Sequence, residues 1–227
     1  MGIKAVIFDL DDTLFDCTGQ LTEPARRRAA EQLADAIPTL SVEALRRLQA
    51  RLADEHGSGG AIREIGRRYC LPPSHIEGAL RAYNRSEVEA ISPFTDVPET
   101  LAELRRRGYR LSLVTTGRPD RQRRKIHLLG LHPFFNEAHA TLVLHDDCRE
   151  PLKDAALQRA TVLLALPPPQ VLSVGDKLDA EIAASNRLHL ATARLRHGRQ
   201  KHRLPQTPEE RPDYEIDRIS DLLHILP

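Results

Sequence analysis

The fold of this chain begins with the stretch IKAVIFDLDDTL, residues 3–14. A short apolar run, rich in β-branched residues, ends there at three carboxylates and a threonine. Such a run is typical of a buried parallel strand, and ligands of open α/β sheets bind beyond the carboxyl ends of the strands. A helix N-cap is the alternative interpretation of one acidic residue. Three acidic residues within four positions favour a chemical role for Asp9 and Asp11.

The close pair of carboxylates itself indicates a kind of chemistry. Asp9 and Asp11 repel each other unless a cation or a phosphate-bound metal lies beside them. One aspartate can act as a nucleophile, because aspartate forms acyl-phosphate intermediates. The other can act as general acid and base. The stretch therefore predicts phosphoryl transfer assisted by a divalent metal.

Composition sets the broad class of the protein. The 227 residues are 41% hydrophobic and 29% charged, with a formal net charge of +1, which is ordinary for a globular protein and gives no field that favours nucleic acid or membrane. Cys17, Cys70 and Cys148 show no metal-ligand spacing and favour a reducing compartment. Neither a signal peptide nor a membrane-spanning stretch is visible. We expect a cytoplasmic monomer or homodimer with a small-molecule partner, and no nucleic acid or membrane.

Helical periodicity without a convincing strand follows the first motif, from about residue 22 to residue 92. Proline in the first turn at Pro24 and a capping serine at Ser41 mark two helix starts. A break at 57–60 and a new start at 72–74 mark two more. The sequence therefore predicts a four-helix insertion over 21–92, between core segments 1–20 and 93–227.

Strands and helices alternate in the rest of the chain. The predicted strands cover 110–115, 138–144, 171–174, 190–195 and 214–216. The predicted helices cover 96–107, 121–129, 153–166, 178–187 and 220–226. Such alternation indicates βαβ units and a parallel sheet, so the expected class is α/β with an inserted helical module.

Polar groups recur at the carboxyl ends of these strands. Thr115-Thr116-Gly117 offers a hydroxyl and backbone N–H groups before a helix, which suits a phosphate, although a capping turn is the plainer interpretation. Lys153 falls where the helix dipole disfavours a cation, although a solvated lysine is the alternative. Asp176 follows Gly175 at another strand end and can meet Mg²⁺ together with Asp9. Jointly these positions favour phosphoryl transfer.

The order and spacing of these motifs resemble the haloacid dehalogenase-like hydrolase superfamily over nearly the whole chain. The motifs that carry the resemblance are Asp9-Leu10-Asp11-Asp12-Thr13, Thr115-Thr116-Gly117, Lys153, and Gly175-Asp176 with Asp179 or Glu181. The resemblance implies a Rossmann-like core. The segment 22–92 falls in the place of the helical cap (type C1) of the subfamily that includes phosphoglycolate phosphatase-like enzymes.

The resemblance also implies a role for each matched position. Asp9 would attack phosphorus, and Asp11 would protonate the leaving oxygen and then activate water. Thr115, with Thr116 and Gly117, would hold the phosphoryl group, and Lys153 would neutralise charge. The metal ligands would be Asp9, the backbone carbonyl of Asp11, and Asp176. Glu181 is favoured over Asp179 as the second acidic position of the last motif.

Asp11 separates the expected reaction from its rivals. An alkoxide leaving group needs a proton and a halide does not, so a Mg²⁺-dependent phosphatase acting on a small phosphorylated metabolite is favoured over a dehalogenase. A phosphomutase on the same scaffold and a non-catalytic binding protein remain alternatives. We expect the basic segments 118–125 and 194–203 to be a solvated helix face and an exposed loop.

Overall fold

The structure, a computed structural model, describes residues 2–85, 90–135, 141–144 and 152–227. The chain divides into two compact units. One unit comprises Met1–Thr18 and Val88–Pro227, and the other comprises Gly19–Glu87. The sequence places the corresponding boundaries at 21 and 92. Cys148 and the predicted strand residues 138–140 lie outside the described residues.

A parallel sheet forms the centre of the first unit. Its strands are β1 Ala5–Phe8, β2 Arg110–Thr116, β3 Thr141–Leu144, β4 Val171–Gly175, β5 Ala191–Leu195 and β6 Tyr214–Ile216. They lie in the order β3-β2-β1-β4-β5-β6, and every neighbouring pair is parallel. The predicted α/β class with a parallel sheet is confirmed.

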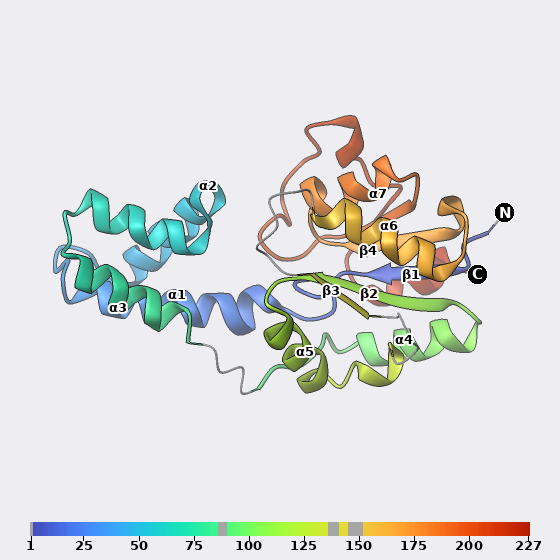
Figure 1. Cartoon of the computed structure of the whole chain (residues 1–227), viewed down its shortest axis with the longest axis horizontal. Coiled ribbons are helices and arrows are strands. Elements are labelled where there is room, and N and C mark those ends of the chain that lie inside the picture. Colours follow the sequence, from blue (N-terminus) through green and yellow to red (C-terminus); the bar gives the residue numbers. More distant parts are fainter. Residues whose placement is uncertain (1, 86–89, 136–140, 145–151) are drawn as a thin grey trace. The chain divides into compact units, whose positions relative to one another are not determined.

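Helices cover both faces of this sheet. They are α4 Val97–Arg106, α5 Pro119–Leu128, α6 Leu152–Leu164, α7 Ala183–Arg187 and α8 Leu222–Ile225. Figure 1 shows α6 and α7 on one face and α4 and α5 on the other. All four residues of β1 are buried, because a strand with neighbours on both sides and helices on both faces has no solvated side. The apolar run at the start of the sequence is therefore the central strand.

Alternation along β1 distributes its side chains between the two layers. Ala5 and Ile7 belong to the core cluster that includes Leu157 of α6 and Ala184 of α7. Phe8 makes an edge-to-face contact with Phe135, with ring centroids 6.4 Å apart, an arrangement that aromatic pairs prefer. Packing on both faces thus fixes the strand that ends in the carboxylates.

The second unit is helical. It contains α1 Glu23–Ala34, α2 Val42–Arg68 and α3 Pro73–Tyr83. Ser41 caps α2 by accepting a hydrogen bond from the Ala44 N–H at 3.1 Å, as the sequence predicts. The predicted second and third helices form one element with a kink at Gly57, whose φ of 68° and ψ of 167° are not helical. Glycine adopts such a φ without a steric cost.

Both connections to the helical unit leave the core at one place. The Phe94 N–H donates to the carbonyl of Leu14 at 3.1 Å, so the outgoing and returning segments are hydrogen-bonded just beyond β1. None of the helices in the described part of the chain has the length and apolar character needed to cross a membrane.

Candidate active site

Asp9 lies where the strand order of the sheet reverses. Strands β1 to β3 extend to one side and β4 to β6 to the other, and this reversal opens a crevice at the carboxyl ends of β1 and β4. Asp9 follows β1, and its N–H donates to Val174 at 2.9 Å. Asp176 follows β4 directly. Topology therefore brings together two aspartates that are far apart in the sequence.

Lys153 links the first motif to the last. It is the second residue of α6, and its ammonium group hydrogen-bonds to Asp9 Oδ1. The same nitrogen lies 2.8 Å from Glu181 Oε1 and 3.3 Å from the carbonyl of Val114. Lys153, Asp9 and Glu181 are all buried. Charges that leave water need such close partners, so the three form one ionic cluster.

Burial and the shared lysine have opposite effects on the two acids of this cluster. Burial raises the pKa of Asp9 to about 6, although the charge of Lys153 opposes the shift. Burial also acts to raise the pKa of Glu181, but the charges of Lys153 and Lys177 outweigh it and lower the pKa to about 2. Burial acts to lower the pKa of Lys153, but the charges of Asp9 and Glu181 outweigh it and raise the pKa to about 12. The lysine therefore stays charged near neutral pH.

Asp176 is a buried carboxylate with an unused acceptor. Its side chain is 1% exposed, and Oδ1 has no hydrogen-bond partner among the described residues. Burial raises its pKa well above the usual value. An unpaired buried carboxylate is costly, whereas a divalent cation prefers hard oxygen ligands. Asp9 and Asp176 thus fit the donor set that Mg²⁺ requires.

Asp11 makes a second set of contacts, with two residues of α5. Both of its carboxylate oxygens are 2.8 Å from Lys125 Nζ. Gln122 donates to Asp11 Oδ2 at 3.3 Å and to Thr115 Oγ1 at 2.5 Å. The predicted proton-transfer residue and the predicted phosphate-binding hydroxyl therefore share a partner from α5.

The remaining residues of the threonine motif end β2. Thr115 is 1% exposed, whereas Thr116 and Gly117 are half-buried. Gly117 has a φ of +139°, and a Cβ atom there would lie 3.2 Å from Gln122 Cδ. Glycine at this position therefore permits both the turn and the close approach of Gln122.

The structure distinguishes the two acidic residues of the last motif. Glu181 accepts a hydrogen bond from the Lys177 N–H at 3.3 Å and contacts Lys153. Asp179 points elsewhere, to Arg203 at 2.8 Å, with a side chain that is 50% exposed. A Cβ atom at Gly175 would lie 2.7 Å from Glu181, so the glycine leaves room for this carboxylate. Glu181, and not Asp179, is therefore the acidic residue of this motif that contacts Lys153.

The expectation that the basic segments 118–125 and 194–203 are exposed to solvent is wrong at two positions. Lys125 is 4% exposed and Arg194 is 2% exposed. The helical period places Lys125 on the buried face of α5 with Gln122 and Ile126, a spacing of three to four residues that the sequence already contains. That spacing is the signal by which the burial of Lys125 could have been found.

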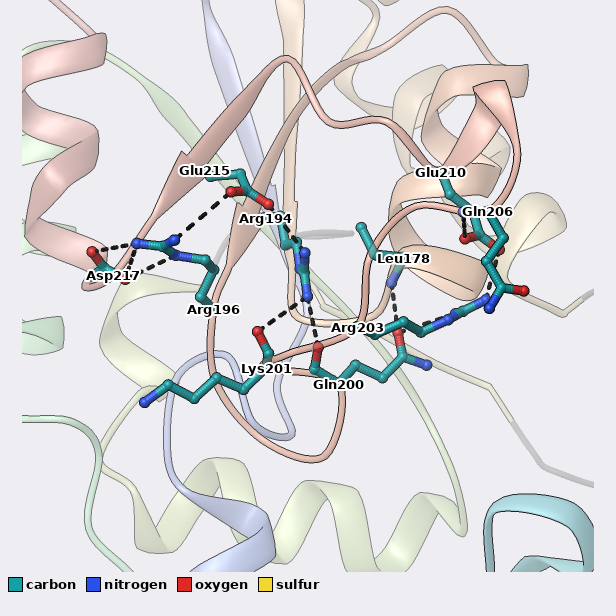
Figure 2. A network of polar contacts seen from close by, with 10 residues as sticks. All are labelled: Leu178, Arg194, Arg196, Gln200, Lys201, Arg203, Gln206, Glu210, Glu215 and Asp217. Carbon is teal, nitrogen blue, oxygen red and sulfur yellow. Dashed lines mark hydrogen bonds and ion pairs between the residues drawn. The ribbon is translucent and has the colours of Figure 1, made fainter.

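Arg194 anchors the loop that follows β5. It donates to Glu215 at 3.0 Å and to the carbonyl of Gln200 at 2.6 Å. Figure 2 shows this network, in which Arg203 also pairs with Glu210 at 2.8 Å. A buried guanidinium needs several acceptors, and here the backbone of the loop supplies them. The basic residues of 194–203 thus include structural groups that hold the loop in place.

This loop reaches the first motif. A Cβ atom at Gly198 would lie 2.9 Å from Asp12, and His197 lies 3.2 Å from Asp16. Asp12, Asp16 and His197 offer ligand atoms within 4.8 Å of one another. The Asp12 carboxylate already accepts two hydrogen bonds of 2.7 Å from the N–H and hydroxyl of Thr18. The Asp12 carboxylate therefore holds the turn after the first motif.

Comparison with known proteins agrees with this architecture. The sequence model of the haloacid dehalogenase-like hydrolase family matches residues 3–189 of this chain. The chain is 34% identical to a glyceraldehyde 3-phosphate phosphatase of Methanopyrus kandleri, covering 99% of this chain and 97% of that protein. It is 27% identical to the protein of the same name from Methanocaldococcus jannaschii, with the same coverage.

A solved structure gives a similar result for the fold. A structure named as a predicted phosphoglycolate phosphatase from Haemophilus somnus 129pt superposes with a TM-score of 0.69 at 20% identity, covering 98% of this chain and 97% of that one. Since the family model covers most of the chain and the Methanopyrus kandleri relative aligns over nearly its full length, the chain belongs to the haloacid dehalogenase-like hydrolase family.

Proposed function

We propose that this hydrolase is a Mg²⁺-dependent phosphatase that acts on a small phosphorylated metabolite through a phosphoryl group carried by Asp9. The observation that carries the proposal is the arrangement beyond β1. Buried Asp9 accepts a hydrogen bond from Lys153. Asp11, two residues later, accepts a hydrogen bond from Gln122, which also donates to the Thr115 hydroxyl. This arrangement supplies a nucleophile and a proton-transfer group after β1 and a phosphate-binding group at the end of the neighbouring strand β2.

In the first half-reaction, Asp9 forms a bond from its carboxylate oxygen to phosphorus while the ester P–O bond breaks. Asp11 in its protonated form gives the proton to the departing oxygen. The Thr115 oxygen accepts from Gln122, which leaves its own O–H free to donate to the phosphoryl group. Lys153 holds a positive charge beside Asp9 and so balances the negative charge of the phosphoryl group.

In the second half-reaction, a water oxygen bonds to phosphorus while the bond to Asp9 breaks. Asp11 takes the proton of that water and returns to its starting form. The net change is an ester and water converted to an alcohol and inorganic phosphate. An acid and base of this kind contributes about 10²–10⁴ in rate.

Asp9, Asp176 and the backbone carbonyl of Asp11 are the groups we assign to the metal. The unpartnered Oδ1 of buried Asp176 supports this assignment. When bound, Mg²⁺ supplies positive charge that stabilises the ionised form of Asp9 and the phosphoryl oxygens. Because Asp11 is retained, an oxygen leaving group is favoured over a halide.

The helical unit Gly19–Glu87 is our candidate for the control of substrate choice. In the core unit, the segments before and after this insertion are hydrogen-bonded through the Phe94 N–H and the Leu14 carbonyl, and in other enzymes closure of an inserted module over a site excludes water. Glyceraldehyde 3-phosphate is the first substrate to test, because the two curated relatives described above carry that name.

The test is release of inorganic phosphate from a panel of phosphorylated metabolites, measured with purified protein and Mg²⁺. We expect turnover of at least one small phosphomonoester, and loss of turnover in the variant Asp9→Asn, whose amide keeps the shape but not the charge. Turnover undiminished in Asp9→Asn would contradict the role of Asp9. Accumulation of a bisphosphate in place of inorganic phosphate would indicate a phosphomutase.

A further inference from the structure

Lys125 is a buried cation that the mechanism above does not use. It lies on α5, its side chain is 5% exposed, and its Nζ is 2.8 Å from both oxygens of Asp11. Nζ is also 3.9 Å from Cys17 Sγ and 5.9 Å from the centroid of the Phe15 ring. A lysine loses hydration when it is buried, and this loss is tolerated only where a close partner compensates. Asp11 is that partner.

Gln122 adds a second contact from the same face of α5. Residues three apart on a helix are neighbours, and the Gln122 amide donates to Asp11 Oδ2 at 3.3 Å and to Thr115 Oγ1 at 2.5 Å. The amide also packs against Gly117. The same face of α5 therefore contacts both the Asp11 carboxylate and the Thr115 hydroxyl.

We propose that Lys125 is a positioning residue for Asp11, which it holds in one orientation through both carboxylate oxygens. Each carboxylate oxygen accepts in two directions. Lys125 occupies one direction on each oxygen and Gln122 occupies a second direction on Oδ2, so the carboxylate cannot rotate freely. The inference rests on the proposed function, in which Asp11 gives and then takes a proton.

Leaving-group dependence distinguishes this role from a structural one. A poor leaving group such as an alkoxide needs the proton from Asp11, whereas 4-nitrophenolate needs it far less. In Lys125→Met we expect kcat/KM for an alkyl phosphate, which reports the step in which the leaving group departs, to fall about 10²-fold, the cost of a misplaced catalytic group. The loss for 4-nitrophenyl phosphate should be much smaller. We compare kcat/KM and not kcat, because hydrolysis of the phosphoryl group on Asp9 is common to both substrates and also uses Asp11.

Three further variants isolate the contact. Arg124→Met removes a cation from the adjacent, exposed position of α5 and should change neither rate. Lys125→Arg keeps the charge and should recover part of the lost rate on the alkyl phosphate. Adding Lys125→Met to Asp11→Asn should cost little beyond Asp11→Asn alone, because a residue that acts through another gives a non-additive double variant.

An equal loss of kcat/KM on both substrates, or additive losses in the double variant, would overturn the inference. If Lys125→Met does not fold, Lys125→Gln takes its place in every comparison. Crystal structures of the parent and the variant give an independent readout, since the variant should show Asp11 in a different or a mixed orientation. An unchanged Asp11 would overturn the inference. A parent enzyme that hydrolyses no ester would refute the proposed function alone, and the two crystal structures would still decide the role of Lys125.

Discussion

This chain has only five lysines, and three of them interact with the carboxylates that follow β1 and β4. Lys125 contacts Asp11, and Lys153 contacts Asp9 and Glu181. The negative charge of Glu181 raises the pKa of Lys177 the most, and the charges of Asp176 and Asp9 raise it further. The ammonium group is a compact point charge, whereas the guanidinium is a planar fork. In a chain with 28 arginines, it is the compact ammonium group of a lysine, Lys153, that contacts both Asp9 and Glu181.

Replacement of Asp9 tests this electrostatic arrangement through stability. The folded protein raises the pKa of Asp9 from 3.8 to about 6, so Asp9 contributes stability below pH 3.8 that is lost as pH rises through 6. Asn does not titrate. The free energy of unfolding of Asp9→Asn relative to the parent should therefore increase between pH 4 and pH 7, by up to about 3 kcal/mol. Urea titrations in EDTA measure it.

Glu181→Gln is the matched control with the opposite sign. The pKa of Glu181 falls from 4.5 to about 2 in the folded protein, so Glu181 contributes stability above pH 4.5 that is lost as pH falls through 2. The stability of Glu181→Gln relative to the parent should fall as pH rises from 2 to 5. Parallel profiles for the two variants would show that Lys153 does not favour ionisation of Glu181 over that of Asp9.

At the scale of elements, glycine decides how closely two helices of the second unit approach. Gly66 of α2 is buried, and a Cβ atom there would lie 2.5 Å from Ile76 Cγ1 on α3. Gly78 of α3 has its nearest neighbour at 3.8 Å, which is ordinary contact. Both glycines lie within helices, where alanine is intrinsically preferred, so only the packing differs between them.

The pair of substitutions Gly66→Ala and Gly78→Ala tests this difference. Gly66→Ala should destabilise the protein by about 1–3 kcal/mol, because the added methyl group overpacks the α2–α3 contact. Gly78→Ala should stabilise it by about 0.5–1 kcal/mol. Thermal unfolding followed by circular dichroism measures both. The addition of Ile76→Ala should relieve part of the cost of Gly66→Ala, and a failure to do so would place the strain elsewhere.

At the scale of the whole molecule, the acidic residues of the site and the connections of the helical unit meet at one edge of the sheet. The carboxylates of Asp9 and Asp176 come from strands that neighbour each other only in the folded core. A ligand held by both therefore stabilises the folded state alone. This coupling makes metal binding measurable without substrate.

Removal of the metal should abolish turnover and lower the melting temperature. EDTA should silence phosphate release, and Mg²⁺ should restore it, because the donors are hard oxygens. Saturating Mg²⁺ should raise the melting temperature of the parent, and Asp176→Asn should weaken that rise. The substitution Asp179→Asn serves as the control, since Asp179 pairs with Arg203 outside the cluster. Full activity in excess EDTA, with no ion found by elemental analysis, would rule out the metal.

Replacement of 19–89 by a short glycine–serine linker tests the proposed role of the helical unit. The linker can close because the two connections are hydrogen-bonded between Leu14 and Phe94. We expect the shortened protein to hydrolyse acetyl phosphate at nearly the parent rate, and to lose kcat/KM for larger phosphorylated metabolites. Unchanged kcat/KM across the whole panel would refute the specificity role.

The sequence by itself determined the elements and the chemical groups at their ends. The run before Asp9, the periodicity of 22–92 and the helix starts at Pro24 and Ser41 are local signals, and local backbone preference and burial pattern decide strands and helices. For the same reason the parallel α/β class followed from the alternation of elements alone.

Only the tertiary structure decided which charges face one another. The choice of Glu181 rather than Asp179 as the partner of Lys153, the contact of Lys125 with Asp11, and the burial of Arg194 all join segments that are distant in the chain. These pairings depend on how α5, α6 and the loop after β5 pack on the sheet. Packing fixes the face that each helix buries, and desolvation then requires each buried charge to find a partner from another element.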